Sequence, residues 1–168
     1  MINWILAAVI AFSPASEITT ARKLYLSVTD EDAFDTFNTF VEPFANHSNP
    51  LLQGYSAVAL SMSASYSYNP YTKLKAFNQG RDRLENVIKL HPNQSELRFL
   101  RLGVQIHAPS FLDYNDNIEA DSKNVLKAVC SGTWKSDPTF EKAVIAFLKK
   151  HAPLSKDELL LLNQQDRN

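Results

Sequence analysis

Residues 69–107 read NPYTKLKAFNQGRDRLENVIKLHPNQSELRFLRLGVQIH. Pro70 stands in a first helical turn, where its missing N–H costs nothing, and apolar residues follow at helical spacing as far as Leu90. Pro92 then ends this helix. In the next segment, 95–107, apolar side chains point all round the axis, which is typical of a buried central helix. The stretch therefore predicts two consecutive helices, with the second inside the fold.

Gly80 lies on the apolar face of the predicted helix 70–90. Glycine inside a helix costs about 1 kcal/mol relative to alanine, so we expect another helix to cross closely at this point. The preceding segment, 50–67, carries a run of small residues from Ser61 to Ser65 that would permit such an approach.

The rest of the chain continues this pattern of capped, amphipathic helices, and no stretch shows the period-two alternation of a strand. From residue 17 onward we count about eight helices in four consecutive antiparallel pairs, beginning near residues 17, 50, 94 and 137. This spacing is typical of helical-repeat arrays. We therefore expect one all-α domain over residues 16–168, built either as an α-solenoid or as an irregular helical bundle.

Composition excludes several classes of protein. The 168 residues carry a formal net charge of −1, whereas general nucleic-acid binders need a basic excess, so no nucleic-acid partner is expected. The single Cys excludes an intramolecular disulfide, and four Gly residues leave little room for glycine-rich phosphate loops.

The N-terminal sequence INWILAAVIAF, residues 2–12, is apolar and is followed by small residues at Ser13 and Ala15. This arrangement predicts a signal peptide over residues 1–15 and a periplasmic or secreted protein. The apolar run is too short for a membrane span of about twenty residues, so no stable membrane insertion is expected after cleavage. The alternative is a first core helix of a cytoplasmic protein.

Residues 84–97, LENVIKLHPNQSEL, resemble the boundary between two tetratricopeptide repeats. Counted back from the Pro-Asn turn, Tyr71 and Gly80 fall on the tyrosine and small-residue positions of that repeat, while Ala64 and Ser67 depart from its Trp and Leu positions. The resemblance covers about one repeat of four and implies antiparallel helix pairs with a concave groove. The stretch 69–102, together with residues 111–115, also resembles small exported helical proteins of bacteria with no assigned activity.

No catalytic, nucleotide-binding or metal-binding motif is present, and no cofactor is expected. The acidic connector that starts at Asp113 begins like a calcium loop, but Ile118 occupies the obligatory glycine position. The four His residues form no i, i+4 pair, so a metal site would need ligands from distant segments. Cys130 falls at a predicted helix C-terminus, where burial is expected rather than reactivity.

Arg98, Arg101 and Gln105 form a polar stripe on the otherwise apolar helix 95–107, and such a stripe needs partners. One hypothesis places them in a groove, together with Tyr66 and Lys73, that accepts a carboxylate or phosphate from a ligand. The other hypothesis pairs the two arginines internally with nearby carboxylates, namely Asp113, Asp116, Glu119 or Asp121.

On the first hypothesis the protein is a protein- or peptide-binding module without catalytic activity. The alternative is a small-ligand carrier, or an enzyme, with a pocket between its helices.

Overall fold

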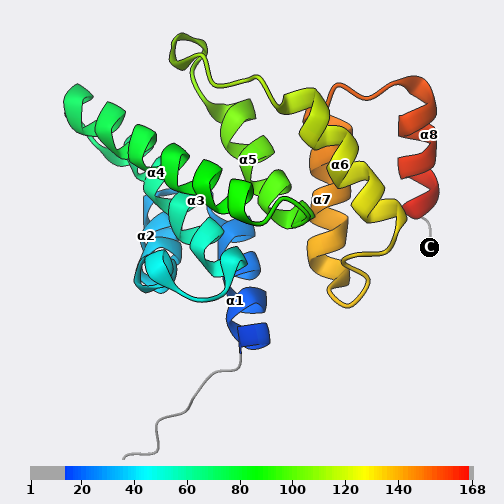
Figure 1. The fold of residues 1–168 in the computed structure, drawn as a ribbon, viewed down its shortest axis with the longest axis horizontal. Helices are drawn as coiled ribbons and strands as arrows, with labels where there is room; N and C mark the ends of the chain where they lie inside the picture. The colour runs from blue at the N-terminus through cyan, green and yellow to red at the C-terminus, as the bar shows by residue number, and fades with distance from the viewer. Residues whose placement is uncertain (1–13, 167–168) are drawn as a thin grey trace, which may run out of the picture.

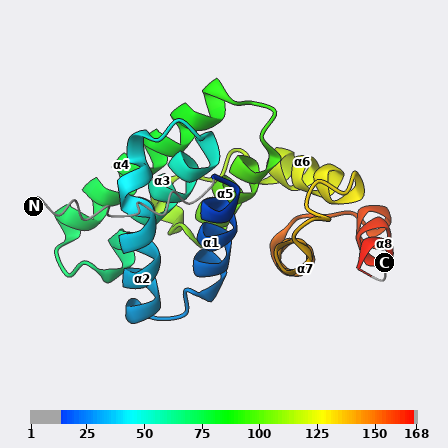
Figure 2. The same cartoon turned by 90° about the horizontal axis from the view of Figure 1, so that it is seen from below.

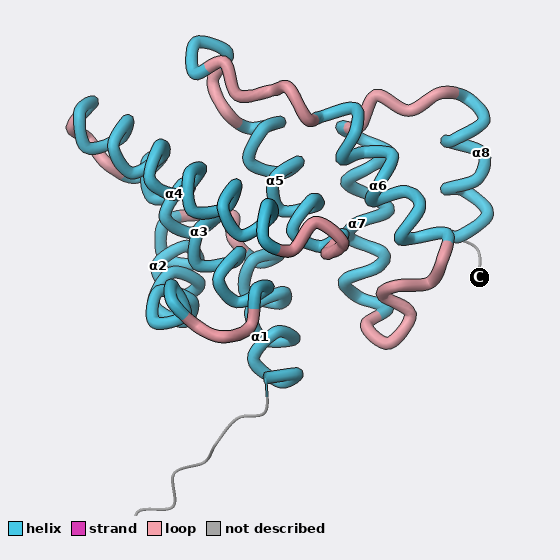
Figure 3. The backbone as a smooth tube through the Cα atoms, viewed as in Figure 1, coloured by secondary structure: helices cyan, strands magenta, loops and turns pink. Residues whose placement is uncertain are grey.

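The computed structural model describes residues 14–166, and this part of the chain consists of helices joined by loops and turns, without a strand (Figures 1 and 3). The all-α prediction is confirmed. The α-helices are α1 (Pro14–Ser27), α2 (Glu31–Val41), α3 (Pro50–Tyr66), α4 (Pro70–Leu90), α5 (Ser95–His107), α6 (Ile118–Cys130), α7 (Pro138–His151) and α8 (Lys156–Gln165). Two short 3-10 helices, η1 (Glu42–Asn46) and η2 (Ser110–Leu112), follow α2 and α5.

Several helices begin at a residue whose side chain caps the first turn. The Asn69 side chain accepts hydrogen bonds from the backbone N–H groups of the first turn of α4, and Asp137 caps α7 in the same manner. Ser155 and Glu158 form a capping box at the start of α8. Because these signals are local in the sequence, they position the element boundaries independently of tertiary packing.

Helices α3 and α4 cross very closely (Figure 1). A Cβ atom added to Gly80 would lie 2.6 Å from the backbone oxygen of Ala57 and would also collide with the backbone N of Ser61. The predicted close crossing at Gly80 is therefore confirmed, and its neighbour is the helix that carries the small residues.

Helix α5 is the central helix, as predicted. It packs against α3, α4 and α6, and Phe99, Leu100 and Leu102 are almost completely buried. A Cβ atom on Gly54 of α3 would collide with the Leu97 side chain, so this glycine lets α3 approach α5. Helix α5 therefore joins α3 and α4 to α6, while α3 also packs against α1, α2 and η1.

The predicted consecutive pairs pack together, but the fold is less regular than a simple array. Helix α1, from the first pair, also contacts α7, from the fourth, and Figure 2 shows α7 between α1 and α8. Arg22 of α1 forms an ion pair of 3.2 Å with Asp137 at the start of α7. Because each unit of a repeat array contacts only its neighbours, this contact is characteristic of an irregular bundle.

The predicted signal peptide, residues 1–15, lies outside the described residues except for its last two positions, which belong to α1. Among the helices of residues 14–166, none has the length and apolar character required to cross a bilayer.

Candidate functional site

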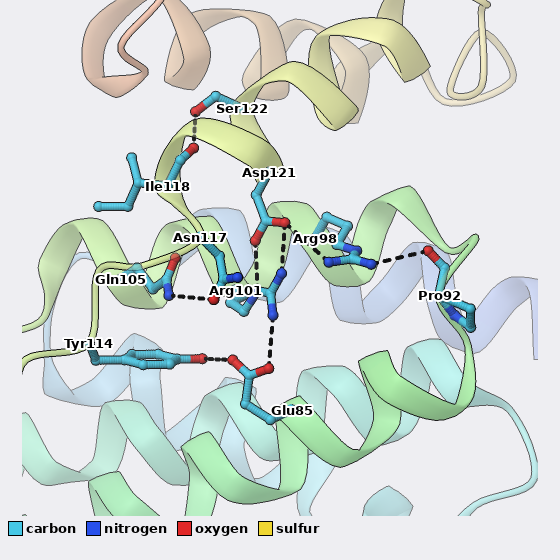
Figure 4. Close-up of polar contacts among 10 residues, drawn as sticks. All are labelled: Glu85, Pro92, Arg98, Arg101, Gln105, Tyr114, Asn117, Ile118, Asp121 and Ser122. Atoms are coloured by element: carbon cyan, nitrogen blue, oxygen red, sulfur yellow. Dashed lines mark hydrogen bonds and ion pairs between the residues drawn. The ribbon is translucent and has the colours of Figure 1, made fainter.

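Arg101 lies in a buried ion network between α4, α5 and α6 (Figure 4). Its guanidinium donates to both carboxylate oxygens of Asp121, at 2.7 and 2.8 Å, and to Glu85 at 2.8 Å. Tyr114, in the connector before α6, donates a 2.5 Å hydrogen bond to Glu85. The side chains of Arg101 and Asp121 are 5% and 1% exposed, so this bidentate pair is almost fully removed from water.

The charge of Arg101 is stabilised by its partners. Burial opposes the charge, but hydrogen bonds and attraction from Asp121 and Glu85 outweigh burial and raise the pKa of the guanidinium. Burial and the hydrogen bond to Glu85 likewise raise the pKa of the Tyr114 phenol. The contacts of Arg101 with Asp121 and Glu85 therefore join three helices.

Arg98 and Gln105 face the same interior network rather than a groove. Arg98 donates to Asp121 and to the carbonyl of Pro92, each at 3.4 Å, and Gln105 donates to Asn117 at 3.3 Å (Figure 4). Of the two hypotheses for the stripe, the internal pairing with Asp121 is the one that the structure shows. Glu85, the second partner of Arg101, did not appear among the predicted partners.

The groove of five residues predicted from the sequence is therefore not formed. Arg101 and Gln105 are buried beneath α6, whereas Tyr66 and Lys73 line a pocket elsewhere. The reason is that Arg101 and Gln105 project from α5 toward α6, while Gly103 and His107 of the same helix border the pocket.

A second buried network, centred on Glu96, was missed by the sequence reasoning. Glu96 is 3% exposed and accepts hydrogen bonds from Arg22, from Tyr55 at 2.8 Å and from Trp134 at 3.1 Å. Its donors come from α1, α3 and the loop after α6. Because every donor is distant in the sequence, this network ties the two ends of the bundle together and forms no accessible site.

The pocket has a volume of about 780 Å³ and lies between the C-terminal halves of α3 and α5, the N-terminal half of α4, the end of α1 and η2. Its floor consists of buried side chains, among them Val58, Phe77 and Val104. Its rim consists of exposed residues, among them Lys73 and Phe111. We call this feature the α3–α5 pocket.

Small side chains at the end of α3 leave the space that the pocket occupies. Ala64 and Ser65 face it, and Ser61 beside them allows the close crossing at Gly80. Tyr66 ends α3 by stacking on Phe34, with ring centroids 4.5 Å apart, and so closes one side of the pocket. In the sequence, the small residues between Ser61 and Ser65 predict a close helix crossing but not the pocket.

The pocket contains few polar groups. Among its described lining residues, Lys73 and His107 are basic and no Asp or Glu is present. Burial raises the pKa of the Tyr25 phenol to about 12, and its hydroxyl makes no hydrogen bond within residues 14–166. Ser61, 4% exposed, also has a side-chain oxygen without a partner in the described chain. A ligand would therefore meet an apolar surface with a few unused hydrogen-bonding groups.

Large apolar side chains surround the opening. Phe111 and Leu74 line the pocket and are 81% and 47% exposed. Tyr68 and Tyr71, which stand close to Pro70 in the sequence, are 97% and 77% exposed but do not line the pocket. Exposed aromatic residues of this kind are typical of an interaction surface.

Residues 14–166 contain no group of three or more His, Cys, Asp or Glu side chains arranged to hold a metal ion. The expectation that Cys130 is buried is wrong, because its side chain lies on the exposed side of the C-terminal end of α6. No protein-family model matches the chain, and comparisons with curated proteins and with solved structures found no significant similarity. The tetratricopeptide-like resemblance therefore stays a prediction.

Proposed function

We propose that the protein binds a small ligand with an elongated apolar body, and that the ligand occupies the α3–α5 pocket. The observation that carries this proposal is the pocket itself, about 780 Å³ in volume, with a buried apolar floor that includes Val58, Phe77 and Val104. Ligand pockets typically measure about 300–1,000 Å³ and combine apolar walls with a few polar groups. Of the functions considered from the sequence, the ligand carrier is the one that this geometry favours.

The affinity would come mainly from removing the apolar ligand from water. Each buried methylene contributes about 0.8 kcal/mol, so two additional methylenes are expected to raise the affinity roughly tenfold while room remains in the pocket. The hydroxyl of Tyr25 and the ammonium of Lys73 would orient a polar end of the ligand.

A chain-length series tests this proposal. Hexanol, octanol and decanol are titrated into the protein by calorimetry, and the affinity should rise at each step. Ala64→Trp places an indole within the pocket and should abolish binding, whereas Ala120→Trp, on the exposed surface of α6, should not change it. Equal binding by both variants, or no dependence on chain length, would contradict the proposal.

Protein or peptide binding is the second candidate, and three exposed aromatic side chains favour it. Tyr68, Tyr71 and Phe111 offer the large side chains that dominate protein interfaces. The triple variant with Ser at these positions should lose a crosslinked partner in the native cell. A variant with Ser at the exposed residues Leu160 and Leu161 of α8 serves as the matched control and should retain that partner.

Export also stays a proposal, supported by the apolar run and by the small residues before Ser16. The intact mass of the chain recovered from its native cell tests it. A chain that begins at Ser16 would support export, and a chain that retains residues 1–15 would contradict it.

A further inference from the structure

Helices α5 and α7 end side by side, and each ends on a histidine. The imidazole rings of His107 and His151 have centroids 5.6 Å apart and planes inclined at 60°. Both rings contact Phe147, with centroid separations of 6.2 and 4.9 Å. These two residues, here called the histidine pair, are 44 positions apart in the sequence, and the fold brings them together.

One nitrogen of His107 is already engaged. Its Nδ1 lies 2.8 Å from the backbone oxygen of Gly103, and this contact fits a donated N–H and leaves the lone pair on Nε2. Metal-binding histidines typically show this arrangement, in which a backbone carbonyl fixes the tautomer and the ring orientation. The ring of His151 makes no hydrogen bond within residues 14–166, so either of its nitrogens is available to a ligand.

The separation of the rings matches shared coordination of one ion. A Zn²⁺–N bond of about 2.1 Å places an imidazole centroid roughly 3.2 Å from the metal. A tetrahedral angle between two such ligands then separates the centroids by about 5.2 Å, and an angle near 120° by about 5.5 Å. The observed 5.6 Å lies close to the upper of these two values.

Both negative and positive charges lie near the histidine pair. The C-termini of α5 and α7 each carry a partial negative charge, and both point toward the histidine pair. Lys150 is the opposing charge on α7. Because two helix ends converge on the pair, a cation between the rings would be attracted by carbonyl groups that lack helical partners.

We propose that His107 and His151 bind a divalent transition-metal ion of the Zn²⁺ class at the rim of the α3–α5 pocket. Imidazole nitrogen favours Zn²⁺, Cu²⁺ and Ni²⁺ over Mg²⁺ and Ca²⁺. Only two ligands come from the protein, so the ion keeps open positions for water or for a donor atom of a second ligand. His107 also lines the pocket, so the ion would bind next to it.

Calorimetric titration of the untagged full-length chain with Zn²⁺ tests the site. We expect one ion per chain, and we expect His107→Ala and His151→Ala each to lower the affinity at least about tenfold, since even indirect ligand partners contribute that much. His91→Ala, at the exposed end of α4, is the matched control, and Cys130→Ser tests for binding at the exposed thiol. Both should bind Zn²⁺ as the unmodified chain does, and Mg²⁺ should not bind.

Loss of binding in Cys130→Ser or His91→Ala, or unchanged binding in either His107→Ala or His151→Ala, would overturn the proposal. Melting temperature provides the second measurement. Zn²⁺ should raise it in the unmodified chain and not in the two histidine variants, because a ligand that binds only the native state stabilises that state. Both variants should melt as the unmodified chain does when metal is absent, since neither ring is buried.

Discussion

Replacing Arg101 by Leu is the most informative perturbation of the fold. The substitution leaves Asp121, whose side chain is 1% exposed, with only the 3.4 Å contact from Arg98 as a charged partner. Removing one member of a buried ion pair typically costs about 3–5 kcal/mol, because the remaining charge is neither hydrated nor paired. For a chain of this size, about 2–4 °C is lost per kcal/mol, so we expect the melting temperature to fall by roughly 6–20 °C.

Helical circular dichroism during urea and thermal unfolding measures this effect. The double variant Arg101→Leu/Asp121→Leu should recover part of the loss, since it also removes the unpaired carboxylate. Lys123→Leu is the control, because its pair with Glu119 lies on the surface, and its melting curve should match that of the unmodified chain. A loss below about 1 kcal/mol for Arg101→Leu, or strictly additive losses in the double variant, would refute the reasoning.

Three further predictions concern the packing and the buried groups. Gly80→Ala should lower the unfolding free energy by about 1–3 kcal/mol. The loss should exceed that of Gly54→Ala, because the new methyl group meets backbone atoms at position 80 but the flexible ends of leucine side chains at position 54. Equal losses of the two variants in urea titrations would contradict this. Trp134→Phe removes one charged hydrogen bond from Glu96 and should cost about 1.5–3 kcal/mol in the same assay. Stability should fall between about pH 10 and pH 12, because the unfolded Tyr25 phenol ionises near pH 10 while burial raises its native pKa to about 12. Tyr25→Phe should make that fall shallower, and an unchanged slope would show that Tyr25 does not contribute.

The helices could be predicted from the sequence because their signals are local. Asn69 and Pro70 specify the start of α4 through hydrogen bonds and ring geometry within one turn. Gly80 indicated a close crossing because a glycine lowers helix stability relative to alanine, and a closely packed neighbouring helix compensates for this cost. The apolar circumference of α5 indicated its central position.

The candidate sites depend on the relative placement of distant helices, which periodicity does not encode. Arg101 points toward α6, and the position of α6 is set by tertiary packing. The sequence therefore could not predict which carboxylates, Asp121 and Glu85, pair with Arg101. The pocket is a volume between several helices that no side chain fills, so no single residue in the sequence predicts it. His107 and His151 meet because α5 and α7 end together.

Chemical-shift mapping by NMR tests the central claim most directly, that the α3–α5 pocket is a ligand site. Decanol is added to isotope-labelled protein, and the signals of the backbone amides and methyl groups are followed. We predict saturable shifts concentrated at Met62, Ala64 and Val104, with the exposed leucines of α8 unaffected. Shifts that spread over the surface without saturation, or that concentrate on α8, would contradict the account.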